Sequence, residues 1–314
     1  MTLSLQALRS HASRWVLDRP YDPEEELRRC ERLGARILCP EDSLYPELLR
    51  LIPDPPPVLY ALGRLPLQGP AIALVGSRKP TPYGRRTARR LAAECASAGL
   101  VVVSGLARGV DTEAHEAAVG AGGRAWAVFG SGLDRVYPED NAQLAAKIIA
   151  CGGTLLSEVP LGGAPAARHF PLRNRLIAGL SWGTIVVEGD LRSGSLITAR
   201  RALEQGRDVF AVPGPIDSPM SAGPNDLIAQ GAKPVRTISD VIGGIGPLAV
   251  TAGGGGSGAP DEEKILELLG GHTLDLEQLL SETGWEIGRL MRTLAEMETH
   301  RQIGLVPGQR YART

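Results

Sequence analysis

Short apolar segments alternate with amphipathic stretches through the middle of the chain, and this pattern restricts the possible folds most strongly. The apolar segments are residues 71–75, 100–103, 125–129, 154–156, 184–187 and 208–212, and amphipathic stretches at 81–98, 110–121, 141–151 and 196–205 lie between them. Continuously apolar strands are typical of parallel sheets that helices cover on both faces. The pattern therefore predicts an α/β fold with a mostly parallel sheet.

Small residues follow most of the predicted strands. They are Gly76-Ser77, Ser104-Gly105 and Gly130-Ser131-Gly132. In doubly wound sheets, ligands bind outside the carboxyl ends of the strands. We therefore expect a bound group to approach the backbone at these loops.

Different kinds of sequence flank this region. Asp22-Pro23 followed by three glutamates predicts a helix start, and the proline-rich residues 53–57 predict a rigid connector. Glycine-rich residues 251–260 are typical of a flexible linker. The predicted organisation is a small N-terminal helical extension (1–65), a central domain (66–250), a linker (251–260) and a C-terminal domain (261–314).

The C-terminal domain has the pattern of a winged helix. Helices are expected at 261–269, 274–281 and 287–298, and a hairpin is expected around Pro307-Gly308. Winged helices often bind duplex DNA through the third helix. This domain carries 6 basic and 10 acidic residues, a net charge of −4, which favours contact with protein over contact with DNA.

The composition argues against several classes of protein. No apolar run approaches the roughly 20 residues that cross a bilayer, and the N-terminus lacks the pattern of a secretory signal. Cys30, Cys39, Cys95 and Cys151 are far apart and form no Cys-x-x-Cys motif, which argues against a disulfide framework or a zinc site. We expect a cytoplasmic protein with no membrane association, metal or cofactor.

Positive charge is concentrated in the central domain. The whole chain has 34 basic and 35 acidic residues, whereas residues 66–250 have 19 and 15, a net charge of +4. Residues 71–93 hold six cations without an acidic residue, and residues 159–187 hold three arginines without one. An anionic partner is therefore expected to bind the central domain.

Two loops have the composition of a phosphate site. Gly76-Ser77-Arg78 joins a predicted strand to a predicted helix, where free backbone amides and a guanidinium can hold an anion. Ser193-Gly194-Ser195 enters another helix in the same way. A tight turn at the first loop and a helix cap at the second explain these residues equally well.

Residues 168–175 are the most unusual stretch. Arg168, Arg173, Asn174 and Arg175 surround Phe170, in a chain with only 4% aromatic residues. Cations that hold phosphates, together with an aromatic ring on which an unpaired base stacks, are the groups that bind single-stranded nucleic acid. The alternative is a solvated loop with Phe170 in the core.

Motifs of enzymes are weak in this chain. The first strand is not followed by Gly-x-Gly-x-x-Gly, and the phosphate loop Gly-x-x-x-x-Gly-Lys-Ser/Thr does not occur. Asp111 and His115 lie one helical turn apart, but a helix cap with a hydrogen-bonded His is favoured because no Ser or Cys adjoins them. Ser195 has no base nearby in the sequence. We therefore assign no catalytic residue.

An ordered set of motifs extends through residues 36–240. It comprises Val75-Gly76-Ser77-Arg78, Ser104-Gly105-Leu106-Ala107-x-Gly109, Gly130-x-Gly132-x-x-x-x-Tyr137-Pro138, Phe170-Pro171-x-Arg173-Asn174-Arg175, Ser193-Gly194-Ser195-x-x-Thr198, Val212-Pro213-Gly214 and Gly223-x-Asn225-x-Leu227-Ile228-x-x-Gly231-Ala232. Together these motifs closely resemble the DNA-processing protein A family (DprA, also called Smf). In two respects the chain departs from it: residues 1–35 are shorter than the sterile-alpha-motif-like domain of many members, and Ala167 stands where some relatives have Lys.

The resemblance implies a doubly wound, Rossmann-like domain that binds single-stranded DNA and loads the RecA recombinase onto incoming strands in natural transformation. It also implies a homodimer that forms through this domain, and a C-terminal winged helix. By similarity, Gly76, Ser77 and Arg78 hold phosphates, Arg168 supplies charge and Phe170 stacks a base. The expected DNA-binding residues are Gly76, Ser77, Arg78, Gly105, Arg168, Phe170, Arg173, Asn174, Arg175, Ser193, Gly194 and Ser195.

A Rossmann-type enzyme on a small phosphorylated ligand is the alternative function. Related families include nucleotide phosphoribohydrolases, which carry a Pro-Gly-Gly-x-Gly-Thr loop with a catalytic Glu. This chain lacks the loop, and Pro213-Gly214-Pro215 is its nearest approach. The sequence therefore favours a binding protein over an enzyme.

Overall fold

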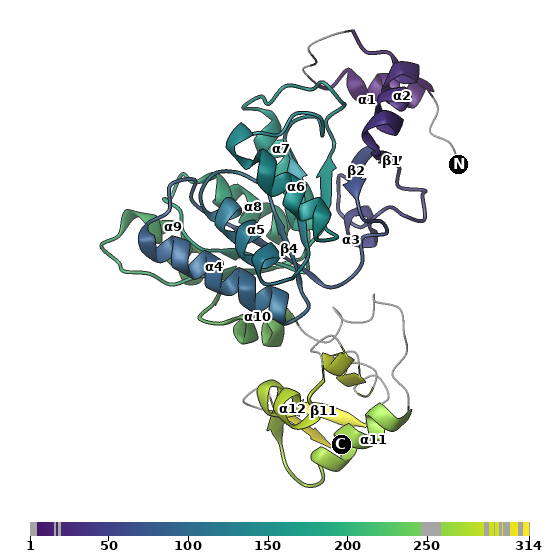
Figure 1. Cartoon of the computed structure of the whole chain (residues 1–314). Coiled ribbons are helices and arrows are strands. Elements are labelled where there is room, and N and C mark those ends of the chain that lie inside the picture. The colour runs from purple at the N-terminus through teal and green to yellow at the C-terminus, as the bar shows by residue number, and fades with distance from the viewer. Residues whose placement is uncertain are drawn as a thin grey trace. The chain divides into compact units, whose positions relative to one another are not determined.

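The chain forms two compact units, Met1–Val235 and Arg236–Thr314 (Figure 1). The computed structural model describes residues 5–15, 17, 20–245, 259–285, 289–291, 293–294, 297, 302–306 and 310–313. Among these residues, no helix is both long enough and apolar enough to cross a bilayer.

The first unit is built on a nine-stranded sheet with the strand order β1-β2-β6-β5-β4-β3-β7-β8-β9. Every pair from β6 to β9 is parallel, as predicted, whereas β1 and β2 add antiparallel strands beside β6. The strands are β1 (Arg36–Leu38), β2 (Leu59–Gly63), β3 (Ala71–Val75), β4 (Val101–Ser104), β5 (Ala125–Phe129), β6 (Thr154–Ser157), β7 (Gly183–Val186), β8 (Asp208–Ala211) and β9 (Lys233–Pro234).

Apolar side chains cover both faces of this sheet. In β5, Ala125, Ala127 and Phe129 pack in one hydrophobic cluster, and Trp126 and Val128 pack in the other, because successive side chains of a strand point to opposite faces. Residues of α6 complete the first cluster, and residues of α7 and α8 complete the second. The helices are α4 (Pro82–Ser97), α5 (Val110–Gly120), α6 (Ala142–Ala150), α7 (His169–Gly179), α8 (Gly194–Glu204) and α9 (Ala222–Ala229).

The order of the strands reverses between β3 and β7. The chain proceeds from β3 outward to β6, and α7 then returns it to β7, which pairs with β3 on the other side. In doubly wound sheets such a reversal opens a crevice at the carboxyl ends of the two strands. The predicted Rossmann-like architecture is therefore confirmed, and it places the crevice beside the loop after β3.

The N-terminal region contains strands as well as the expected helices, which are α1 (Leu5–Ala12), α2 (Pro23–Leu33) and α3 (Glu47–Arg50). The predicted start of α2 is present, since the Asp22 side chain accepts a hydrogen bond from the Glu24 amide. However, β1 and β2 join the large sheet. Segments of three and five residues are too short for hydrophobic periodicity to distinguish strand from helix, so these two strands were not predicted.

The second unit contains α10 (Ile238–Ile245), α11 (Ala259–Leu268), α12 (Leu276–Thr283) and a three-stranded antiparallel sheet. The sheet has the order β10-β12-β11, with β10 at Leu274–Asp275, β11 at Ile303–Val306 and β12 at Arg310–Arg313. Of the predicted third helix, residues 289–291, 293–294 and 297 are helical, and the rest lies outside the described residues. So do the predicted hairpin turn at Pro307-Gly308 and residues 251–258 of the predicted linker, whereas α11 already begins at Ala259.

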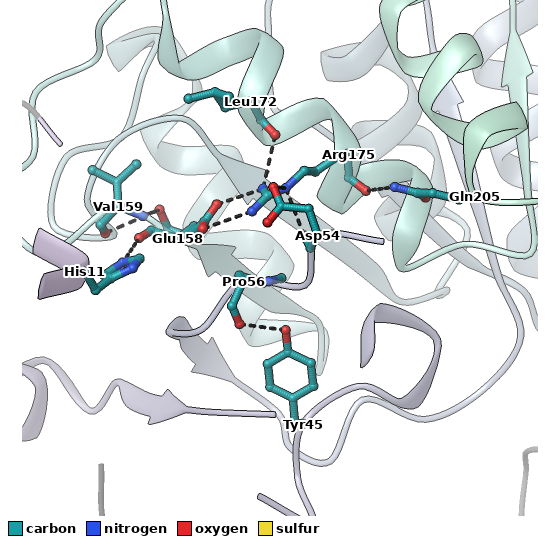
Figure 2. Close-up of polar contacts among 10 residues, drawn as sticks. His11, Tyr45, Asp54, Pro56, Glu158, Val159, Leu172, Arg175 and Gln205 are labelled. Atoms are coloured by element: carbon teal, nitrogen blue, oxygen red, sulfur yellow. Dashed lines mark hydrogen bonds and ion pairs between the residues drawn. The ribbon is translucent and has the colours of Figure 1, made fainter. Parts of the chain in front are cut away.

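A buried ion pair joins α7 to the end of β6 (Figure 2). The Arg175 guanidinium donates to both carboxylate oxygens of Glu158, at 2.8 and 3.0 Å, and its Nε donates to Asp54 at 3.0 Å. The Arg175 and Glu158 side chains are 7% and 3% exposed. Removal of Glu158 leaves the buried Arg175 charge with the exposed Asp54 carboxylate and without its buried partner, so this pair is sensitive to truncation.

We therefore predict that Glu158→Ala lowers the free energy of unfolding by about 3–5 kcal/mol, as measured by urea denaturation. The control is Glu204→Ala, which removes the exposed ion pair between Arg201 and Glu204 and should cost about 0–1 kcal/mol. Equal losses in the two variants would contradict this assignment.

Candidate nucleic-acid interface

A cavity of about 800 Å³ opens at the carboxyl ends of the strands where their order reverses. Its lining comes from the loop after β3, the start of α5 with the loop before it, and the loop between β5 and α6. The first turns of α7 with the loop before them, the loop after β7 with the start of α8, and Met220 complete it. This is the position at which doubly wound sheets bind ligands.

Nine of the predicted DNA-binding residues line this cavity, although they come from three separate segments of the chain. They are Gly76, Ser77, Arg78, Phe170, Arg173, Asn174, Ser193, Gly194 and Ser195. Gly105, Arg168 and Arg175 do not line it.

Phe170 presents a half-buried aromatic ring among cations. The Arg78 guanidinium lies 5.3 Å from the ring centroid and the Arg173 guanidinium lies 6.0 Å from it. The Tyr137 ring lies 5.7 Å away, tilted by 38°, and is 46% exposed. A Cβ at Gly130 would lie 2.9 Å from the Phe170 ring, so glycine is needed where the ring packs. Tyr137 was absent from the predicted set, although it lies in a motif that the sequence analysis quoted.

Arg173 is a buried cation beneath the cavity. It is only 6% exposed, and its guanidinium donates to the carbonyl oxygens of Gly105, at 2.7 Å, and of Val128. Burial lowers the pKa of Arg173 to about 10, while the nearby Asp111 carboxylate opposes this shift. Its Nε has no hydrogen-bond partner among the described residues. Arg173 therefore holds a fixed positive charge at this point.

The small residues after the strands make room for side chains of the protein itself. A Cβ at Gly105 would lie 2.1 Å from the Arg173 guanidinium, and a Cβ at Gly76 would lie 2.7 Å from a methyl carbon of Val110. We expected a bound group to approach the backbone at these loops. On the side where a Cβ would lie, atoms of the protein already occupy the space at Gly76, Gly105 and Gly130, whereas Gly76 still lines the cavity.

The start of α4 also differs from the expected anion site. Glu188, which is 2% exposed, accepts hydrogen bonds from the Thr81 amide at 2.8 Å and from the Thr81 hydroxyl at 2.6 Å. The Thr81 hydroxyl in turn accepts from the Gly84 amide. The protein's own groups thus satisfy these amides. Arg78 and Lys79, which are exposed just before this helix, are the groups left to meet an anion.

Hydroxyl groups at the start of α8 also line the cavity. Ser193 caps α8 by accepting from the Ser195 amide, and the two hydroxyl oxygens are 2.8 Å apart. A Cβ at Gly194 would meet no atom within 4 Å, so the backbone is accessible there. The Asn174 side chain donates to the Gly194 carbonyl at 3.3 Å and ties α7 to this loop.

The side chains of residues 168–175 point to different parts of the protein, because most of these residues belong to a helix. Successive residues of an α-helix are rotated by about 100°, so Arg173 and Arg175 point to nearly opposite sides. Arg173 lines the cavity, whereas Arg175 binds Glu158 and Asp54. Arg168 is exposed just before α7, outside the cavity lining. Arg173 and Arg175 thus lie on different faces of one helix, which an interpretation of residues 168–175 as a loop does not predict.

The cavity lining carries more positive than negative charge. Arg78, Lys79, Arg173 and Arg192 line it together with only two carboxylates, Asp111 and Asp190. Asp190 accepts a hydrogen bond from the Arg192 amide at 2.8 Å. Asp111 accepts from the amides of Gly105 and Ala107, at 3.0 and 3.3 Å, and burial raises its pKa. The arrangement favours an anionic ligand.

His115 is fully buried, and a backbone contact with Ser104 partly opposes the lowering of its pKa by burial. The described part of the chain also contains no group of three His, Cys, Asp or Glu side chains that could hold a metal ion.

Two protein families match the chain. The family of DNA recombination-mediator protein A matches residues 36–246, and the DprA winged helix domain matches residues 255–309. Protein Smf of Escherichia coli is 40% identical over 91% of this chain and 79% of its own length. The DNA processing protein DprA of Bacillus subtilis is 48% identical over 67% of this chain and 71% of its own length.

Two solved structures resemble this chain in fold and sequence. The crystal structure of DNA processing protein A from Streptococcus pneumoniae has a TM-score of 0.63 at 40% identity and covers 71% of this chain and 82% of its own. DNA processing protein A from Helicobacter pylori, whose structure was determined for its single-stranded DNA binding mode, has a TM-score of 0.60 at 33% identity. That match covers 68% of this chain and 96% of the other.

Because His115 is buried, we predict that the protein loses stability in acid. Burial lowers its pKa from 6.5 to about 4, so between these values the unfolded chain binds a proton that the folded chain does not. Stability is therefore present above pH 6.5 and falls by about 3 kcal/mol as the pH drops to 4. The free energy of unfolding is measured by urea denaturation at pH 7 and at pH 5. Between these pH values it should fall by about 2 kcal/mol less in His115→Asn than in the wild type. The exposed His272→Asn serves as the control, and wild-type pH dependence in His115→Asn would contradict the prediction.

Proposed function

The chain belongs to the DNA recombination-mediator protein A family, and on this premise we propose that its cavity binds single-stranded DNA. The observation that supports this most directly is the meeting of Arg78, Arg173 and Phe170 in one cavity. Cations beside an accessible aromatic ring suit a polynucleotide whose bases are unpaired.

Each group has a distinct part in the proposed complex. The exposed Arg78 and Lys79 bind phosphates, and the buried Arg173 adds a positive field from below. Phe170, with Tyr137 beside it, stacks a base. In a duplex the bases are stacked on each other and cannot reach a half-buried ring, so the cavity selects single strands.

We further propose that the bound strand is passed to the RecA recombinase during natural transformation. In this proposal the protein works in the cytoplasm as a homodimer that forms through the Rossmann-like domain. The family description as a recombination mediator supports the transfer step. The assay is RecA filament formation on an oligonucleotide coated with single-strand-binding protein, which this protein should accelerate.

We also propose a binding protein rather than an enzyme. The two acids that line the cavity, the buried Asp111 and the exposed Asp190, both accept hydrogen bonds from backbone amides of the chain. A phosphoribohydrolase needs an acid free to act on its ligand. Release of free base from nucleoside monophosphates, abolished by Glu188→Gln, would contradict this proposal.

Arg78→Ala should weaken binding to single-stranded oligonucleotides of every sequence. Loss of one phosphate contact lowers the steepness of the log–log salt dependence of affinity by about 0.7. The measurement is fluorescence anisotropy with labelled oligo(dT) and a matched duplex at several salt concentrations. Arg86→Ala is the control, because Arg86 is exposed on α4 and does not line the cavity. Wild-type protein that binds the duplex as tightly as the single strand would contradict the proposed function.

Phe170→Ala should weaken binding without changing the salt dependence, because the ring carries no charge. The loss of one stacked base corresponds to about 1–3 kcal/mol, or roughly 5- to 150-fold in Kd. Leu172→Ala is the matched control, since Leu172 is 46% exposed on the same helix and does not line the cavity. Unchanged affinity in Phe170→Ala would rule out stacking on this ring.

A further inference from the structure

The loop of residues 158–168 leads from the end of β6 to Phe170, which is the second residue of α7. The position of this loop therefore decides where the ring lies. Most of its backbone is not part of a helix or strand, so contacts with other segments have to hold it. The N-terminal segment, residues 8–29, supplies several of these contacts.

Hydrogen bonds from three N-terminal side chains reach the backbone of the loop. His11 Nε2 lies 2.7 Å from the Glu158 carbonyl oxygen (Figure 2). The Glu26 carboxylate accepts from the Leu161 amide at 2.8 Å, and the Arg29 guanidinium donates to the Leu161 carbonyl at 3.3 Å. In addition, Leu17 forms an antiparallel β-bridge with Gly163. The N-terminal segment thus holds the loop at three successive points, residues 158, 161 and 163.

An ion pair reinforces this attachment. The Arg29 guanidinium binds the Asp134 carboxylate at 2.5 Å, and the same carboxylate accepts from the Gly162 amide at 2.8 Å. Leu161 packs in a hydrophobic cluster with Leu8 and Cys30 of the N-terminal region. The side chain of Leu161 and the backbone on both sides of its Cα are therefore fixed from the N-terminal side.

A second connection reaches the residue next to Phe170. The Trp15 ring packs edge-on against the His169 ring, with centroids 5.0 Å apart. His169 Nδ1 lies 3.3 Å from the Gly130 carbonyl oxygen, and Gly130 is the residue against which the Phe170 ring packs. Trp15 and His169 are 9% and 1% exposed, so both are held within the protein.

We infer that the N-terminal segment is a positioning element of the DNA-binding cavity: by holding the loop of residues 158–168, it fixes Phe170 for base stacking. This inference rests on the proposed function. Ordering the backbone of one residue costs roughly 1–2 kcal/mol, and a loop already held in place does not meet that cost when DNA binds. The segment is thus part of the binding domain rather than an independent extension.

The inference is tested by a double-mutant cycle between Glu26 and Phe170. Glu26→Ala removes the acceptor for the Leu161 amide, and it should weaken oligo(dT) binding by a factor of about 3 to 30 with an unchanged salt dependence. In a Phe170→Ala background the same substitution should have no further effect, because the ring it positions is gone. Glu26→Gln keeps an acceptor oxygen and should restore binding. Glu25→Ala is the control, because Glu25 pairs with Arg28 and Arg32, two exposed arginines of the N-terminal region.

Arg29→Ala, combined with Phe170→Ala, provides a second double-mutant cycle. This cycle tests the inference even if the Glu26→Ala protein does not fold. Arg29→Ala removes the contacts with Asp134 and Leu161, and Arg32→Ala, which removes only a pair with Glu25, is its control. Equal losses in the wild-type and Phe170→Ala backgrounds, or no loss in either, would overturn the inference while the proposed function stands. Wild-type protein that does not bind oligo(dT) would instead overturn the proposed function.

Discussion

The buried guanidinium of Arg173 connects the sheet to the cavity. Its donors reach carbonyl oxygens at the ends of β4 and β5, so α7, which carries it, begins at a fixed place above the strand ends. A cation is costly to remove from water unless acceptors and opposite charge surround it. Two carbonyls and the nearby Asp111 carboxylate meet that need. Arg173 also lines the cavity, where Phe170 and Arg78 lie.

The carboxylates of the first unit explain why the cavity stays positive. Glu158 binds Arg175, Glu188 binds Thr81, and Asp111 binds backbone amides, and all three are almost completely buried. Each acid therefore stabilises the fold at a fixed point. Arg78 and Lys79 remain exposed at the rim of the cavity. The exposed Arg78 and the buried Arg173 both lie beside the Phe170 ring. These three acids thus stabilise the fold, whereas cations outnumber carboxylates in the cavity lining.

The sequence was sufficient to predict the central sheet, because its strands are short, apolar and separated by amphipathic helices. It also predicted that the loops after these strands lie at one edge of the sheet, since parallel strands end on the same side. It could not show why glycines occur there: Gly105 and Gly130 make room for Arg173 and Phe170, which are distant in sequence. Nor could it show that Arg173 lines the cavity and Arg175 does not, because this difference depends on a helix that begins at His169. The strands β1 and β2 and the contacts of the N-terminal segment depend on tertiary packing that no local pattern records.

Photo-crosslinking tests the central claim most directly, because it reports which side chains a bound base touches. Oligo(dT) that contains 5-iodouracil is irradiated with the full-length protein, and the linked peptides are identified by mass spectrometry. The account predicts crosslinks at Phe170 or Tyr137, the two rings at the cavity. Crosslinks confined to the second unit, residues 236–314, or to α4 would show that the strand binds elsewhere and would contradict the account.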